Sequence, residues 1–168
     1  EAGGAQCALF KPVPTAPGDY YATPFGAPGA PGSSYCDGIN GMGQIVGSYW
    51  TDPSGDAYTG FVDDAEGGDP GDAANFRTVV APESPITQPL GINNDGLIAG
   101  NAEIGGPDSL QSGFLLDAGE FISVILPASY ESNVFGLNDD VQVVGSSFAG
   151  CSEDGCPYIN GFILDTQH

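Results

Sequence analysis

The sequence predicts an all-β fold of three tandem repeats, and three observations lead to that prediction. A ten-residue phrase recurs as GINGMGQIVG at 38–47, GINNDGLIAG at 91–100 and GLNDDVQVVG at 136–145. The 27 glycines and 14 prolines divide the chain into short elements. No window has the composition of a long helix, whereas the phrases alternate β-branched residues with turn residues.

Each phrase reads as a strand, a tight turn and a second strand. Asn-Asp-Gly at 94–96 and Gly-Met-Gly at 41–43 tolerate the positive φ angles of a hairpin turn. An apolar triplet with β-branched residues follows each turn. The matched positions are Gly38, Ile39, Asn40, Ile45, Gly47; Gly91, Ile92, Asn93, Ile98, Gly100; and Gly136, Leu137, Asn138, Val143, Gly145.

Further strands recur after each phrase. A Gly-Phe strand is predicted at 60–63, 113–117 and 161–165, and its phenylalanine is predicted to be a core residue. A third strand ending in proline follows at 76–82 and 121–127. The phrases recur at intervals typical of propeller blades. We therefore expect an N-terminal arm and Gly/Pro-rich segment (1–37) and a three-repeat domain (38–168), whose units are 38–90, 91–135 and 136–168 and contain three or four short antiparallel strands each.

The third unit lacks the last of these strands. The missing Phe-x-x-Val spacing is found instead in residues 7–14, between Phe10 and Val13. An unpaired strand at 161–165 would expose backbone donors and acceptors. We therefore expect residues 7–14 to pair beside Phe162 and Leu164, either within one chain or between chains by strand addition. Three blades are too few to close a propeller, and this favours exchange between chains.

These phrases resemble those of bacterial secreted proteins with HAF-type extracellular repeats. The similarity covers residues 38–165 well and residues 7–14 weakly. It implies an extracellular, β-rich repeat protein, and the family brings no established catalytic residues with it. The low number of repeats, the long arm and the cysteines outside the phrases are departures from the family pattern.

The composition restricts the classes of partner. With 22 acidic and 2 basic residues the net charge is −20, which repels nucleic acid and anionic membranes. No apolar run is long enough for a membrane span. Four cysteines, very little lysine and a first residue other than methionine predict a secreted or cell-surface protein.

The cysteines predict disulfides more strongly than a metal site. Cys151–Cys156, across a polar turn, is the first choice of bridge, and Cys7–Cys36 is the second; the sequence leaves the other pairings open. Zinc would need further ligands, and the sole histidine is His168.

An acidic, glycine-rich stretch at 63–72 is a weak calcium hypothesis. Carboxylates on a flexible loop suit calcium, but their spacing does not match an EF-hand, and a solvated acidic turn is the preferred interpretation. The candidate ligands are Asp63, Asp64, Glu66, Asp69 and Asp72. No other cofactor is expected.

No catalytic arrangement is indicated, because no nucleophile and base form a recognisable set. Aromatic residues gather in the arm and first unit, where they suggest either packing or a glycan site. They are Tyr20, Tyr21, Phe25, Tyr35, Tyr49, Trp50 and Tyr58. The sequence thus predicts a non-enzymatic, self-assembling structural protein, the subunit of a fibre or surface layer. The alternative is a monomeric or dimeric binding module, for glycans or another ligand, with the arm closing on its own chain.

Overall fold

The fold was analysed in a computed structural model, which describes residues 7–30, 32–52, 54, 57–65, 68–104, 110–127, 129–149 and 159–166. In these residues every regular element is a β-strand, so the predicted all-β class is confirmed. The described part has no helix with the length and hydropathy that a membrane crossing requires.

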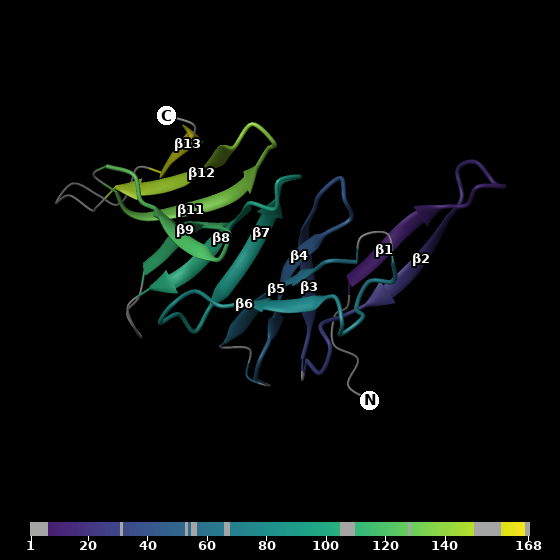
Figure 1. The fold of residues 1–168 in the computed structure, drawn as a ribbon. Coiled ribbons are helices and arrows are strands. Elements are labelled where there is room, and N and C mark those ends of the chain that lie inside the picture. The colour runs from purple at the N-terminus through teal and green to yellow at the C-terminus, as the bar shows by residue number, and fades with distance from the viewer. Residues whose placement is uncertain are drawn as a thin grey trace.

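Thirteen strands are present among the described residues (Figure 1). They are β1 (Cys7–Pro12), β2 (Tyr20–Phe25), β3 (Ser34–Ile39), β4 (Ile45–Trp50), β5 (Tyr58–Asp63), β6 (Phe76–Val79), β7 (Thr87–Ile92), β8 (Ile98–Ile104), β9 (Leu110–Asp117), β10 (Glu120–Val124), β11 (Ser129–Leu137), β12 (Gln142–Ala149) and β13 (Ile159–Asp165).

The strands after β2 form three groups of consecutive antiparallel neighbours. Strand group 1 is the four-stranded sheet β3–β6, strand group 2 is β7–β10, and strand group 3 is β11–β13. The three recurring phrases span the hairpins β3–β4, β7–β8 and β11–β12. Groups 2 and 3 are joined into one seven-stranded sheet, because β11 pairs in parallel with β9 at Ser132 and Ser112.

The asparagine of each phrase organises its own turn. The Oδ1 atom of Asn40 accepts hydrogen bonds from the backbone N–H groups of Met42 and Gln44. Asn93 accepts in the same way from Asp95 and Leu97. A side chain that satisfies two backbone donors closes the turn and explains the asparagine at this position.

These turns are also bonded to one another across the strand groups. Asn40 Nδ2 donates to the carbonyl of Asn93 at 2.9 Å, and Asn93 Nδ2 donates to that of Asn138 at 3.5 Å. The Asn94 side chain accepts from Gly41 N at 2.7 Å, and Asp139 accepts from Asn94 N at 2.9 Å. This polar ladder stacks the three turns in chain order.

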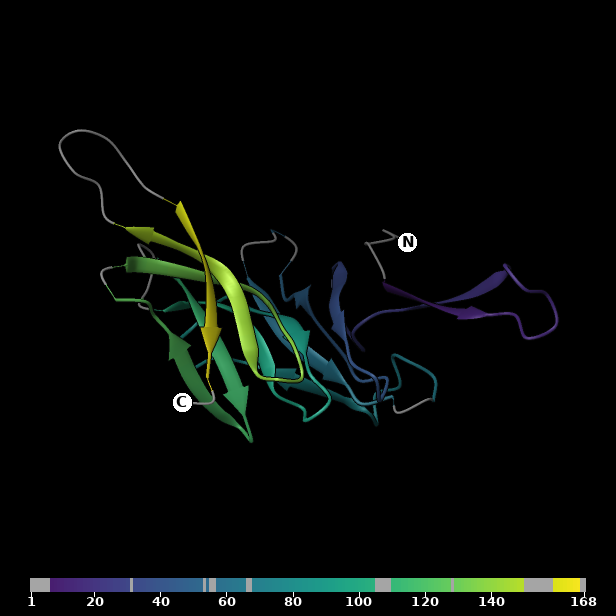
Figure 2. The same ribbon diagram turned by 90° about the horizontal axis from the view of Figure 1, so that it is seen from above.

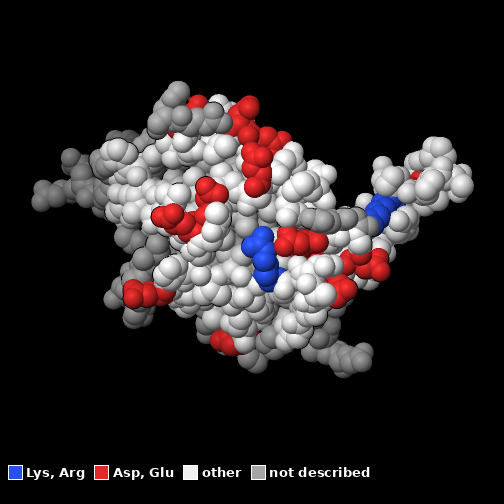
Figure 3. All heavy atoms as spheres, in the orientation of Figure 1, with Lys and Arg blue, Asp and Glu red and all other residues white. Residues whose placement is uncertain are grey.

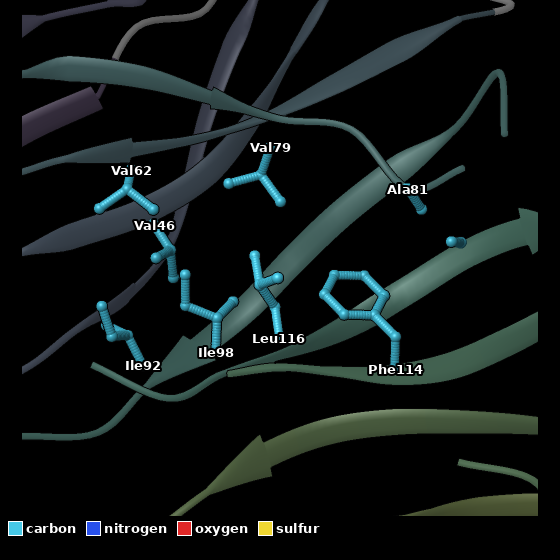
Figure 4. Packing of buried hydrophobic residues seen from close by; sticks show 9 residues of the cluster. Val46, Val62, Val79, Ala81, Ile92, Ile98, Phe114 and Leu116 are labelled. Atoms are coloured by element: carbon cyan, nitrogen blue, oxygen red, sulfur yellow. The ribbon is translucent and has the colours of Figure 1, made fainter. Parts of the chain in front are cut away.

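The hydrophobic core lies between successive strand groups rather than at one centre. Figure 4 shows Val46 and Val62 of group 1 packed toward Ile98 and Leu116 of group 2. The opposite face of group 2 buries Leu115 against group 3. Strand group 2 is therefore covered on both faces, by group 1 on one side and by group 3 on the other.

The N-terminal strand departs from its expected position within the chain. Residues 7–12 pair with β2, and not with residues 161–165. The β1–β2 hairpin projects from one end of the molecule, whereas β13 lies at the opposite end (Figures 1 and 2). A disulfide between Cys7 and Cys36, the second-choice pairing, attaches the base of the hairpin to β3. Cys151 and Cys156 lie outside the described residues.

Candidate functional site: the two ends of the array

The outer face of strand group 3 exposes apolar side chains that are covered elsewhere. In group 1, Gly47 of β4 lies opposite Phe61 of β5. The next cross-strand pair is Val46 and Val62, and both side chains are fully buried. The corresponding pair of group 3 is Val144 and Ile163, which are 43% and 74% exposed. Phe135 of β11 is also exposed. Burial at this position depends on the next strand group, and group 3 has none after it in the described residues.

The edge of β13 is open in the described part of the chain. β13 pairs with β12 on one side, and no described strand lies on its other side. The corresponding strands β5 and β9 pair on their second side with β6 and β10. An open edge of this kind presents backbone donors and acceptors to another strand.

An apolar groove runs beside that open edge. It has a volume of about 530 Å³ and lies between β10 and β13. Its lining includes Leu97, Leu115, Ile122, Val124 and Leu164. A groove lined by aliphatic side chains is suited to an apolar or aromatic side chain.

The β5 and β9 phenylalanines carry a ring partner from the fourth strand of their groups. Phe61 stacks on Phe76 of β6 with ring centroids 4.8 Å apart, and Phe114 contacts Phe121 of β10 at 5.2 Å. Phe162, at the same position of β13, has no ring partner among the described residues. The groove therefore lies where a fourth strand of group 3 would place its aromatic side chain.

The projecting hairpin presents a second apolar surface at the other end. Its two faces alternate along the strands, and Cys7 and Phe25 on one face are buried in a cluster with Ile45 and Phe61. The other face is exposed and carries no charge. Its members are Ala8, Phe10, Pro12, Tyr20, Ala22 and Pro24, with Phe10 and Tyr20 each 64% exposed.

Two of the four predicted assembly residues thus lie at each end of the molecule. Phe10 and Val13 belong to the hairpin region, whereas Phe162 and Leu164 belong to β13. The sequence did not reveal the partners around them. The Phe-x-x-Val spacing shared by residues 121–124 and residues 10–13 was the signal for Ile122 and Val124 of the groove. Tyr20 was expected in the Gly/Pro-rich segment, as one of the aromatic residues that suggest packing or a glycan site.

The predicted calcium ligands do not form a metal-binding group in the described residues. Among the described residues, no group of three or more His, Cys, Asp or Glu side chains could hold a metal ion, and Glu66 lies outside the described part. Asp64 accepts hydrogen bonds from Gln44 and Arg77, while Asp72 accepts from Ala74 N. The described residues add no support to the calcium hypothesis, which stays a prediction.

Asp63 is instead a buried carboxyl group at a core position. Its side chain is fully buried, Oδ2 accepts from Gly71 N, and Oδ1 has no partner among the described atoms. Burial raises the pKa of Asp63, and the charges of Asp64 and Asp72 add to this, although the Gly71 hydrogen bond opposes it. The uncharged form is therefore favoured by folding.

Asp63→Asn should make the folded chain more stable at neutral pH, where the charged carboxylate is unfavourable in the core. The pKa of Asp63 is higher in the folded chain than in the unfolded chain. The contribution of Asp63 to folding stability is therefore complete below the ordinary aspartate pKa, and it is lost as pH rises through the folded-state pKa. Thermal unfolding followed by circular dichroism at pH 4 and pH 7 checks this. We expect D63N to be more stable than the parent at pH 7 and to gain less at pH 4, whereas D117N, an exposed control, should show neither effect. Equal gains at both pH values would contradict the assignment.

Four of the seven aromatic residues suggested for glycan binding contact other rings of group 1, whereas Tyr20 and Tyr21 of the hairpin are exposed. Tyr35, Trp50 and Tyr58 form a cluster with centroids 6.1–6.5 Å apart and tilted or edge-to-face rings. Tyr49 contacts Phe76. These rings therefore contribute to packing of group 1.

On the face seen in Figure 3, the acidic side chains do not gather at one site. They form separate patches there, and the two basic patches lie apart from each other. Comparison with known proteins added no functional assignment: no family model, curated protein or solved structure matched the chain.

Proposed function

We propose that the protein is an extracellular structural subunit that assembles head to tail into a fibre or surface layer, with residues 7–14 of one copy completing the β13 edge of the next. The observation that carries this proposal is the pair of unpartnered surfaces at opposite ends, the β1–β2 hairpin and the β13 edge with its groove. A contact between two different surfaces repeats from copy to copy and generates a filament unless the rotation closes a ring.

The proposal includes the arrangement of the groups as three propeller-blade-like repeat units. Support comes from the ladder of stacked turns and from the common order of strand pairing in each group. The resemblance to HAF-type repeats and the Cys7–Cys36 disulfide both favour an extracellular location. No catalytic residue, metal or cofactor is part of this function.

The net charge sets the conditions for testing assembly. Copies that each carry a charge of −20 repel one another, and salt screens this repulsion over about 8 Å at physiological ionic strength. Association should therefore strengthen between low and physiological salt.

Self-assembly is tested on the full chain by sedimentation velocity and negative-stain electron microscopy over a range of concentrations at physiological salt. We expect polymers, and we expect Ile163→Lys to weaken association by at least about tenfold, because a charge would replace an apolar contact. Val80→Lys is the control, since Val80 is 54% exposed but lies after β6, away from both ends.

Monomers at every concentration would overturn the proposal and favour the alternative of a secreted binding module. Equal loss of association in the two lysine variants would indicate a general effect of charge rather than an interface at β13.

A further inference from the structure

The fourth strands of groups 1 and 2 share one register. Phe76 lies opposite Asp63 and Val79 opposite Gly60, while Phe121 lies opposite Leu116 and Val124 opposite Gly113. In each group this register places the phenylalanine of the fourth strand beside the phenylalanine of its neighbour. The residues Phe10 to Val13 repeat the Phe-x-x-Val spacing.

Resting on the proposed function, we propose that β1 exchanges partners on assembly: it leaves β2 of its own chain and pairs antiparallel with β13 of a second copy. Carrying over the register places Phe10 opposite Leu164 and Val13 opposite Gly161. The Phe10 ring then enters the groove between β10 and β13, where it completes the aromatic pair with Phe162.

The charges at the strand edge agree with this register. Lys11 and Arg77 are the chain's two basic residues, and both directly follow the phenylalanine of a Phe-x-x-Val segment. Arg77 Nε lies 3.1 Å from Asp64, the residue after Asp63. Asp165 follows Leu164 in the same way. The register therefore brings Lys11 next to Asp165, with its aliphatic stem over exposed Ile163.

Exchange is required because β2 occupies the edge of β1 that β13 would use. Val13 N donates to Asp19 O, so by alternation Leu9 and Lys11 also direct their backbone groups toward β2. In β10, the two-residue turn at Ala118 and Gly119 sets the alternation so that Ile122 and Val124 direct their backbone N–H and C=O groups toward β9. Lys11 and Val13 correspond to Ile122 and Val124. The edge of β1 that pairs with β2 is therefore the edge that would pair with β13 of the second copy.

Pro12 fits the exchanged arrangement. Its backbone faces away from the partner strand, so the missing N–H costs no bond to β13. It also removes one backbone donor from the outer edge of the added strand, which discourages further lateral pairing. Beyond its base, which the Cys7–Cys36 disulfide and the cluster around Phe25 hold in place, the projecting hairpin consists of two strands only, and such a pair is marginally stable by itself.

A hairpin that cannot open tests the exchange. Pro12 and Tyr20 are cross-strand partners, and by alternation they form a non-hydrogen-bonded pair, whose side chains are close enough for a disulfide. We expect oxidised P12C/Y20C to assemble at least about tenfold less than the matched P12S/Y20S control. Circular dichroism and peptide mapping check that the locked chain is folded and correctly bridged.

The outcomes separate this inference from the proposed function. Equal assembly by the locked and control chains would overturn exchange while self-assembly stands; failure of the wild-type chain to assemble would overturn both. The register has its own readout: a K11C chain mixed with an I163C chain should form an intermolecular disulfide, and an L9C chain mixed with the I163C chain should not. Polymers with no K11C–I163C bond would overturn the register.

Discussion

Gly100→Ala is expected to prevent stable folding. A Cβ atom at Gly100 would overlap the carbonyl oxygen of Gln88 and lie 2.8 Å from the Phe114 ring. Both obstacles belong to the buried junction of β7, β8 and β9, where the backbone has a bulge between Pro89 and Gly91. We expect destabilisation by more than about 4 kcal/mol, which is of the order of the whole stability of a small domain.

Circular dichroism and thermal unfolding of the variant check this expectation. Gly136→Ala is a matched control from the third phrase, because nothing lies within 4 Å of its added Cβ. G136A should remain folded, with a melting temperature near that of the parent. A folded G100A with unchanged stability would show that the strands can move apart at this position.

Asn101→Ala is expected to loosen the junction between strand groups 2 and 3. The buried Asn101 side chain donates to the carbonyl of Val134 at 3.1 Å and accepts from its N–H at 2.7 Å. Val134 is fully buried beside a bulge in β11. Removing the amide leaves two buried backbone groups without partners, at a cost of about 2 to 4 kcal/mol.

Chemical denaturation measures this loss in N101A, with Asn160→Ala as a control at an exposed position. The measurement is made below the concentration of assembly, so that only the single chain contributes. N101D should not restore the stability at neutral pH, because its second carboxylate oxygen would face the Val134 carbonyl in place of the donor and would carry a buried charge. A loss no larger in N101A than in N160A would mean that water replaces the side chain at the junction.

The repeat allowed most of the strands after residue 34 to be predicted. Gly-Phe periodicity correctly placed Phe61 and Phe114 in the core, where they are 0% and 2% exposed. β2 was missed because Tyr20–Phe25 contains Pro24 and lies in a Gly/Pro-rich stretch that reads as a linker. A proline is tolerated there because β2 is an edge strand with one partner, β1.

Features that depend on contacts between different strand groups could not be predicted from the recurring phrases. Asn101 directly follows its phrase, at a position where the other two units have serine, so nothing in its local sequence indicated a bond to Val134. Asp63 occupies a site that is leucine in β9 and β13, and its neighbours made it look like part of a solvated acidic loop. Residues 7–14 and 161–165 were predicted as partners. The β1–β2 pairing keeps them apart within one chain, and this pairing was not predicted.

The ladder of turns has a consequence for how such chains can lengthen. Each rung connects a turn to its immediate neighbour, and the two rungs join asparagines that are 53 and 45 residues apart in the chain. Loops of different size can therefore be spliced between rungs without changing the stack. A duplicated central strand group would bring its own turn asparagine and turn carbonyl, which are the groups that each rung uses. Gene duplication would then lengthen the molecule without changing either of its ends.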